Sequence, residues 1–425
     1  MSFQFSTSAA AVLFVASSAL ALSSAPIAAQ SKKSDEQRSW TITAERVYTA
    51  EGDAIEDGEI VVEGGKIRAV GKGGGGDLKV FAVTPGLVDL SIRIDQGFLS
   101  VEQSREVTPH VRAAASLDVF DEAWMRAVRG GVTTAMVNVP DRNVIGGLSV
   151  VVKTAGELSA SARVVKADAA LYGAIGSAPS SGNRTASPRP EDFFVRRPTT
   201  RMGVEWEWRK ALFDAAAARV DPKRAKPGDG ELQRALDGKL PLVIQAWASQ
   251  DIRTAVFLVE EARREGWGNP TLIVDAAAEA WREPQLLVRS KAAVVLPPFA
   301  PLGRSGDRSF FALDTAAKLE ALGVPVALSG HDAEALEDRL CYQPGYAMRG
   351  GMSFASALAS VTLTPARLIG VDQRVGSIKA GKDADLVLWN GEPFQPTSKV
   401  VGVLVDGRLI VDPRQAANAS SSSNK

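Results

Sequence analysis

Near each end of the chain, hydrophobic and polar residues alternate in the manner of half-buried β-strands. Residues 59–70 read EIVVEGGKIRAV, two alternating runs that meet at a glycine pair. Turn dipeptides of this kind predict β-hairpins, because their central positions adopt positive φ. Three of them mark expected hairpins near the chain ends: Gly64-Gly65, Asn390-Gly391 and Asp406-Gly407. We expect residues 40–83 and 372–413 to pair into one small β-sandwich built from both chain ends.

Between these ends, short hydrophobic runs alternate with segments of helical periodicity, which is typical of βα units and a parallel sheet. Hydrophobic spacing predicts helices over residues 120–128 and 252–262. Thr364-Pro365 resembles an N-cap with a first-turn proline, and Gly370 is placed to end that helix. The strand candidates are GLVDLSI, VTTAMVNV, LPLVIQAW, TLIVDAA, AAVVLPP and PVALSG. For residues 84–371 the pattern favours an α/β fold, a (β/α)8 TIM-like barrel, over an open sheet.

Four stretches show neither pattern. Residues 173–200 are rich in Ser, Gly, Pro and Arg, and residues 221–230 read DPKRAKPGDG. Both are expected to be irregular surface segments. Residues 30–39 form a polar linker, and residues 414–425 contain a serine run that predicts a disordered tail.

The first 29 residues contain no charged side chain. Residues 9–22 form an apolar run too short to span a bilayer comfortably, and Ile27-Ala28-Ala29 before Gln30 resembles a signal-peptidase site. We therefore expect residues 1–29 to be a signal peptide and the mature chain to be exported, to the periplasm or beyond. An uncleaved membrane anchor is the alternative.

Composition narrows the class of partner. The 425 residues include 49 Lys plus Arg and 49 Asp plus Glu, with 45% hydrophobic residues. This balance gives no indication of nucleic acid or of an anionic membrane surface. A small molecule or another protein is the expected partner, with no membrane span in the mature chain.

Residues able to bind a metal through nitrogen or sulfur are scarce. The chain has one cysteine, Cys341, and two histidines, His110 and His331. A single cysteine forms no intramolecular disulfide and excludes a cysteine-rich metal site. Any metal chemistry would therefore have to depend on oxygen ligands or on these two histidines.

Several segments resemble one enzyme family. VTPGLVDLSIR (residues 83–93) is similar to the first barrel strand of the amidohydrolase superfamily, where a Pro-Gly-hydrophobic-hydrophobic-Asp segment leads into a His-x-His pair. GSIKAGKDADLVLW (376–389) resembles that family's return into its small β-sandwich, and SVTLTPARLIGV (360–371) its last helix. NVIGG, VVVKTAG and RPTTRMG are similar to the imidazolonepropionase-like branch. The resemblance implies hydrolysis of non-peptide C–N bonds.

The resemblance also implies a divalent metal, commonly zinc, at the C-terminal mouth of the barrel. The first His-x-His pair falls on Ser91 and Arg93; serine is a poor zinc ligand and arginine is a permanent cation. The second pair falls on Gln245 and Trp247, and the sixth-strand histidine on Asp275. The chain is therefore identified as a divergent member that lacks the His-x-His ligands.

The eighth-strand region, ALSGHDAE, retains candidate chemistry. Asp332 matches the family's catalytic aspartate in one alignment, whereas Gly330 takes that position in the other. Asp332 and His331 are candidate catalytic residues, because an adjacent base and acid near a strand end can transfer protons. The alternative is that Asp332 caps a helix that begins near Ala333.

The vacated ligand positions are candidates for ligand binding, and two of them allow two interpretations. Arg93 either pairs with Asp275 or Asp332 as a substitute cation, or reaches solvent as an ordinary surface arginine. Trp247 either fills the space of the lost metal site or offers a stacking surface to a ligand.

Two further residues have a structural alternative beside the functional one. His110 is expected to stabilise the loop after the first barrel strand, with metal ligation as the alternative. Lys153 ends a strand, where a carboxylated lysine could bridge two metals; without surrounding histidines this role has little purpose.

These observations favour a non-metal pseudoenzyme or binding protein with a degenerate metal site and no catalytic zinc. The alternative is an active amidohydrolase with a carboxylate-based or metal-free site, which would use Asp275, Asp332, His331 and Lys153. A small molecule is the expected ligand. A homo-oligomer and pairing with an active paralogue are both compatible with the sequence.

Overall fold

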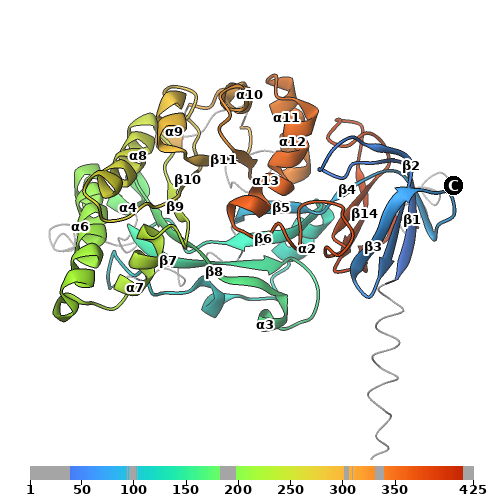
Figure 1. Cartoon of the computed structure of the whole chain (residues 1–425). Helices are drawn as coiled ribbons and strands as arrows, with labels where there is room; N and C mark the ends of the chain where they lie inside the picture. Colours follow the sequence, from blue (N-terminus) through green and yellow to red (C-terminus); the bar gives the residue numbers. More distant parts are fainter. Residues whose placement is uncertain are drawn as a thin grey trace, which may run out of the picture.

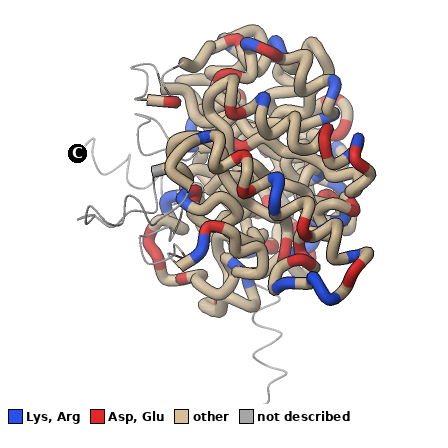
Figure 2. Tube along the Cα trace, turned by 90° about the vertical axis from the view of Figure 1, so that its left-hand side faces the viewer, with Lys and Arg blue, Asp and Glu red and all other residues tan. Residues whose placement is uncertain are grey.

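The structure is a computed structural model with two parts, a barrel and a separate β-sheet (Figure 1). The residues it describes are 39–92, 94, 102, 104–181, 198–300, 306–308, 310–330 and 339–414. The expected signal peptide, most of the linker and nearly all of the expected tail lie outside these residues. Basic and acidic residues are interspersed along the described trace (Figure 2).

The separate sheet has seven strands drawn from both ends of the chain. In spatial order they are β15 (Arg408–Val411), β14 (Val400–Val405), β13 (Leu386–Trp389), β4 (Leu78–Pro85), β1 (Trp40–Val47), β2 (Ile55–Glu63) and β3 (Lys66–Lys72). Strand β4 joins the two ends, because it pairs in parallel with β1 and antiparallel with β13. The predicted β domain built from both termini is therefore confirmed.

Two of the three predicted hairpin turns are present. Gly64 and Gly65, with φ values of 56° and 84°, form the turn between β2 and β3. Asp406 and Gly407 also have positive φ and form the turn between β14 and β15. At Asn390-Gly391 only the tight turn was wrong: β13 and β14 pair antiparallel, but residues 390–399 form a longer loop between them. The Asn390 side chain accepts a hydrogen bond from the Lys399 amide (2.7 Å) across this loop.

The barrel sheet has eight strands. In spatial order they are β5 (Leu87–Ile92), β6 (Val132–Val137), β7 (Ile145–Lys153), β8 (Val164–Ala174), β9 (Leu242–Gln245), β10 (Leu272–Asp275), β11 (Ala293–Leu296) and β12 (Val326–Leu328). All six hydrophobic runs predicted as strands are strands. The sheet is a nearly closed barrel, which confirms the predicted fold class.

Strand β7 departs from a regular (β/α)8 pattern, because it runs antiparallel to both β6 and β8. Only seven residues separate the end of β6 at Val137 from the start of β7 at Ile145. A crossover to a parallel neighbour needs about a dozen residues or more, whereas an antiparallel neighbour needs only a short connection. The loop length therefore fixes the direction of β7.

The larger helices lie to the left of and above the barrel strands in Figure 1. The described helices are α2 (Ala123–Arg129), α3 (Ala160–Arg163), α4 (Ser177–Ser181), α6 (Arg201–Val220), α7 (Asp229–Leu236), α8 (Ser249–Arg264), α9 (Pro284–Ser290), α10 (Thr315–Ala321), α11 (Gln343–Arg349), α12 (Phe354–Ser360) and α13 (Leu363–Leu368). Short 3-10 turns are η2 (Ala113–Ser116), η3 (Pro222–Arg224), η4 (Gly306–Arg308) and η5 (Leu340–Tyr342). Across the described residues, none of these helices has the length and apolar character to cross a membrane.

The predicted helix boundaries needed two corrections. Helix α8 contains the predicted segment, but α2 begins at Ala123, and Phe120 lies before it with 70% of its surface exposed. Helix α13 begins at Leu363, so Thr364 lies inside it and does not cap it. Gly370 has a φ of 65° and follows the end of this helix, as predicted.

Candidate functional site

A cluster of buried polar side chains occupies the C-terminal mouth of the barrel. It consists of Ser91, Tyr172, Gln245 and Asp275, which lie at or near the ends of β5, β8, β9 and β10. All four are almost fully buried, with exposures of 7%, 2%, 1% and 1%. The ends of parallel barrel strands carry the active site in this type of fold. We call this group the mouth cluster.

Asp275 is the acceptor at the centre of the mouth cluster. Its Oδ2 accepts hydrogen bonds from Ser91 Oγ (3.1 Å) and from the Tyr172 hydroxyl (2.9 Å). Its Oδ1 accepts one from the backbone N–H of Ala276 (2.9 Å). Hydrogen bonds to an ionised carboxylate are stronger than those between neutral groups. Three donors therefore satisfy this carboxylate where the fold would place a metal ligand.

Gln245 and Trp247 complete the surroundings of this carboxylate. Gln245 Nε2 donates to the Tyr172 hydroxyl (3.3 Å), while its Oε1 has no hydrogen-bond partner among the described residues. Trp247 is 7% exposed and packs with Ala276 and Ala278. The sequence alignment thus placed Ser91, Gln245, Trp247 and Asp275 in one region, and the structure brings them together.

Tyr172 was missed from the sequence. It lies in β8, which was not among the predicted strands, so no strand end marked its position. The hydrophobic run that contains it, AALYGA, carries the signal that could have identified it. The small residues on either side and the tyrosine hydroxyl near a strand end are typical of a residue that reaches a polar partner inside the core.

A second carboxylate, Asp89, joins the first and last barrel strands. Its Oδ1 accepts hydrogen bonds from the Ser91 N–H (2.9 Å) and from Ser329 Oγ (3.0 Å), and its Oδ2 accepts one from the Gly330 N–H (3.0 Å). These bonds link β5 to the residues that follow β12. Gly330 therefore contributes a backbone donor at the position where one alignment expected a catalytic aspartate.

The remaining candidate residues do not join the mouth cluster. His110 is exposed in a turn, where its carbonyl accepts a hydrogen bond from Arg112 (3.3 Å). Arg93, His331 and Asp332 lie outside the described residues. Their expected roles as a substitute cation and as a proton-transfer pair therefore stay predictions.

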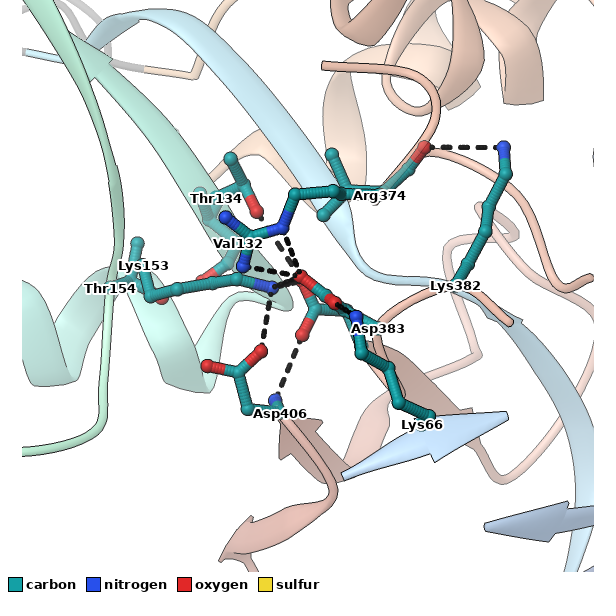
Figure 3. A network of polar contacts seen from close by, with 11 residues as sticks. Lys66, Val132, Thr134, Lys153, Thr154, Arg374, Lys382, Asp383 and Asp406 are labelled. Carbon is teal, nitrogen blue, oxygen red and sulfur yellow. Dashed lines mark hydrogen bonds and ion pairs between the residues drawn. The ribbon is translucent and has the colours of Figure 1, made fainter. Parts of the chain in front are cut away.

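Lys153 lies at the opposite end of the barrel. It pairs in register with Thr134, near the start of β6, because β7 is antiparallel. Its Nζ is 2.6 Å from Asp385, 3.0 Å from Asp383 and 3.0 Å from Asp406, carboxylates of the separate sheet and its turns (Figure 3). Lys153 thus joins the two parts of the molecule, and its position does not fit a bridging metal ligand at the mouth.

These four residues form what we call the junction cluster. Lys66 and Arg374 add two cations to Asp383, the latter at 2.9 Å (Figure 3). Asp385 also accepts hydrogen bonds from Thr134 Oγ1 (3.3 Å) and from the backbone N–H of Asp406 (2.9 Å). Three carboxylates thus meet three cations across the junction.

The junction cluster shifts the pKa values of its members. Burial acts to lower the pKa of Lys153, but the three carboxylates outweigh it and the pKa is raised. Burial acts to raise the pKa of Asp383, but Lys153, Lys66 and Arg374 lower it overall. For Asp385, burial prevails over Lys153 and raises the pKa. Lys153 is therefore protonated, and its positive charge compensates the carboxylates at the junction.

The mouth cluster does not fit the metal that the fold implies. Its ligand atoms are two hydroxyls, one amide and one carboxylate whose two oxygens already accept hydrogen bonds. Zinc in proteins is bound by thiolates, imidazoles and carboxylates, usually three or four of them. Within the described ranges, no group of three or more His, Cys, Asp or Glu side chains has the geometry to hold a metal ion.

Comparison with known sequences agrees with this fold. The model of the amidohydrolase family matches residues 285–411. The amidohydrolase tasK of Hapsidospora irregularis is 26% identical over 336 residues, 73% of this chain and 34% of that protein. The imidazolonepropionase of Aromatoleum aromaticum is 41% identical over 81 residues, 18% of this chain and 20% of that protein. The matches thus span about a third or less of these curated relatives.

Solved structures extend the similarity to nearly the whole chain. An amidohydrolase from Thermotoga maritima MSB8 superposes with a TM-score of 0.75 and 26% identity, over 88% of this chain and 99% of that one. Molinate hydrolase shares the fold at a TM-score of 0.50 and 15% identity, over 88% of this chain and 95% of that one. The barrel, the sheet built from both chain ends and these matches agree: the chain belongs to the amidohydrolase superfamily.

Proposed function

We propose that this chain is an exported amidohydrolase-fold protein with a degenerate metal site. In this proposal it acts as a non-metal pseudoenzyme or binding protein for a small molecule and does not hydrolyse C–N bonds by the metal mechanism. The observation that carries the proposal is the hydrogen bonding of the Asp275 carboxylate. Both of its oxygens accept hydrogen bonds, from Ser91, Tyr172 and the Ala276 amide.

A metal at this position would have to displace those donors. Asp275 would then need further ligands, and its described neighbours in the mouth cluster are hydroxyls and a neutral amide. Such groups are weak ligands for zinc, and a hard ion such as Ca²⁺ takes six to eight oxygens. The donors serve a metal-free carboxylate better than a metal-bound one.

The alternative is an active hydrolase with a carboxylate-based or metal-free site. One of its four expected residues, Lys153, lies at the other end of the barrel and is bound by Asp383, Asp385 and Asp406. This location weakens the alternative. Without Lys153, the alternative depends on Asp275 together with His331 and Asp332.

The test is hydrolysis of a panel of N-acyl amino acids and cyclic amides by the full chain, with and without a chelator. We expect no turnover above the uncatalysed rate in either condition. The matched variants are Asp275→Asn and Asp229→Asn; the latter removes a carboxylate that is also buried (7% exposed) and accepts a hydrogen bond from the Lys226 amide (2.7 Å). Turnover that is lost with chelator and in Asp275→Asn, but kept in Asp229→Asn, would contradict the proposal.

The same panel of substrates distinguishes the alternative, an active hydrolase, from the proposed pseudoenzyme or binding protein. Turnover that resists the chelator but is lost in Asp275→Asn would indicate a metal-free hydrolase. Export is tested separately. The full-length gene is expressed in a bacterium, and the molecular mass of the protein recovered from the periplasm is measured by mass spectrometry. The proposal expects a chain that begins at Gln30, and retention of residues 1–29 in the membrane fraction would contradict export.

A further inference from the structure

A groove outside the barrel wall is lined by β5 on one side and by α2 and η5 on the other. It has a volume of about 320 Å³. Its walls are mainly apolar and include Ile92, Ala127, Val132 and Leu340. Small-molecule sites are concave, mostly apolar and about 300 Å³ or larger, with a few polar groups that fix orientation. The groove is at the lower end of this range, so it suits a small ligand.

Three arginines line this groove, namely Arg126, Arg129 and Arg339. Arg126 and Arg129 lie one turn apart on α2, both are exposed, and neither forms an ion pair within the described part of the chain. Arg339 stacks on the ring of Tyr342 at 4.6 Å. Its Cβ comes within 3.8 Å of where a Cβ would stand at Gly130, so it faces the end of α2. The cations therefore gather from both sides of the groove.

The inner end of the groove is polar but not strongly anionic. Asp89 and Gly330 line it, and Asp89 accepts hydrogen bonds from the Ser91 amide, the Ser329 hydroxyl and the Gly330 amide. These three donors offset the charge of the carboxylate. Among the charged side chains that line the groove, three arginines therefore stand against this one carboxylate.

We propose that this groove binds a small organic acid whose carboxylate pairs with Arg126 and Arg129 while its apolar body lies along Ile92 and Val132. Guanidinium groups match carboxylates in charge and in planar hydrogen-bonding geometry. The apolar walls favour a ligand with a hydrocarbon part over a bare inorganic anion. This site lies beside the barrel wall and does not depend on the state of the mouth cluster.

The experiment is calorimetric titration of the full chain with 4-phenylbutyrate, its uncharged amide and inorganic phosphate. We expect the acid to bind at least about tenfold more tightly than the amide, since hydrogen bonds to a charged group are stronger than those to a neutral one. Phosphate should bind at least about tenfold more weakly than the acid, because it leaves the apolar walls uncovered.

Substitutions inside and outside the groove test whether the acid binds there. Arg126→Gln with Arg129→Gln should weaken acid binding at least about tenfold, while Arg224→Gln, an exposed arginine in η3, should leave it unchanged. Ala127→Trp, which fills the groove, should abolish binding, and circular dichroism confirms that each variant is folded. Equal affinity for acid and amide, phosphate binding as tight as the acid, a double variant that binds like the wild type, or no binding by the wild type would overturn the proposal.

Discussion

The mouth cluster and the junction cluster lie at opposite ends of one barrel, and both are buried polar groups. The mouth cluster has one carboxylate, Asp275, surrounded by hydroxyl and amide donors. The junction cluster has three carboxylates around Lys153, with further cations on Asp383. Among the described residues, cations and carboxylates therefore meet where the two parts of the molecule join, whereas Asp275 at the expected active-site position accepts hydrogen bonds from neutral donors.

This difference separates two uses of buried polar groups. At the junction, each charge is compensated by an opposite charge, and losing one partner leaves the others uncompensated in the interior. At the mouth, losing one neutral donor leaves Asp275 with the remaining ones. The junction should therefore determine the stability of the molecule much more strongly than the mouth does.

The largest effect is expected from Lys153→Met. It removes the cation that three aspartates share, and breaking a buried ion pair on one side costs about 3–5 kcal/mol. The free energy of unfolding is measured by urea denaturation. Lys239→Met, a change at a lysine whose side chain is 71% exposed, is the control and should change stability by less than about 0.5 kcal/mol. A loss below about 1 kcal/mol for Lys153→Met would show that the junction is not the stabilising cluster.

A second, pH-dependent effect is expected from Asp383→Asn. The pKa of Asp383 is lowered in the folded chain, chiefly by Lys153 against the effect of burial. Its carboxylate therefore adds stability above the unfolded pKa of about 3.9, and this contribution is lost as the pH falls through the folded value. The variant should be less stable than the wild type by about 1.5–3 kcal/mol at pH 7, with a smaller gap below pH ~4.

The measurement for Asp383 is urea unfolding at several pH values between 7 and 3. Asp53→Asn, which changes an exposed carboxylate of the same domain, is the matched control and should follow the wild type throughout. A gap between wild type and Asp383→Asn that stays constant over this range would contradict the assigned charge interaction.

The smallest effect is expected from Tyr172→Phe in the mouth cluster. It removes one donor from Asp275 and the acceptor of Gln245 Nε2, so the loss should be about 1–2 kcal/mol. Tyr346→Phe, at a half-buried tyrosine, is the control. A loss for Tyr172→Phe as large as that for Lys153→Met would remove the distinction between the two clusters.

Much of the fold could be predicted from local pattern. Strand runs such as LPLVIQAW and TLIVDAA became β9 and β10, and the glycine pair between β2 and β3 formed its hairpin. The antiparallel direction of β7 could not be predicted from its residues. All nine are buried, so the alternation that distinguishes the two faces of a strand is absent. Only the short loop before β7 encodes its direction.

The two clusters differ in how well the sequence predicted them. The resemblance to the family identified Ser91, Gln245 and Asp275, and ends of parallel strands do meet at one face of a barrel. The alternative role of Lys153 as a bridging ligand fails, because Lys153 ends an antiparallel strand, whose end lies at the other face. Asp383 and Asp385, two residues apart in KDADLVLW, lie more than 200 residues from Lys153 in the chain. No local pattern connects residues so far apart.

The degenerate metal site is tested most directly by the metal content of the full chain, purified without chelator from zinc-supplemented cells. Inductively coupled plasma mass spectrometry gives the molar ratio of zinc, iron, manganese, cobalt and nickel to protein. A degenerate metal site predicts ratios far below one for every metal, unchanged in Asp275→Asn. A near-stoichiometric metal that is lost in Asp275→Asn, and kept in Asp229→Asn, would contradict the degenerate site.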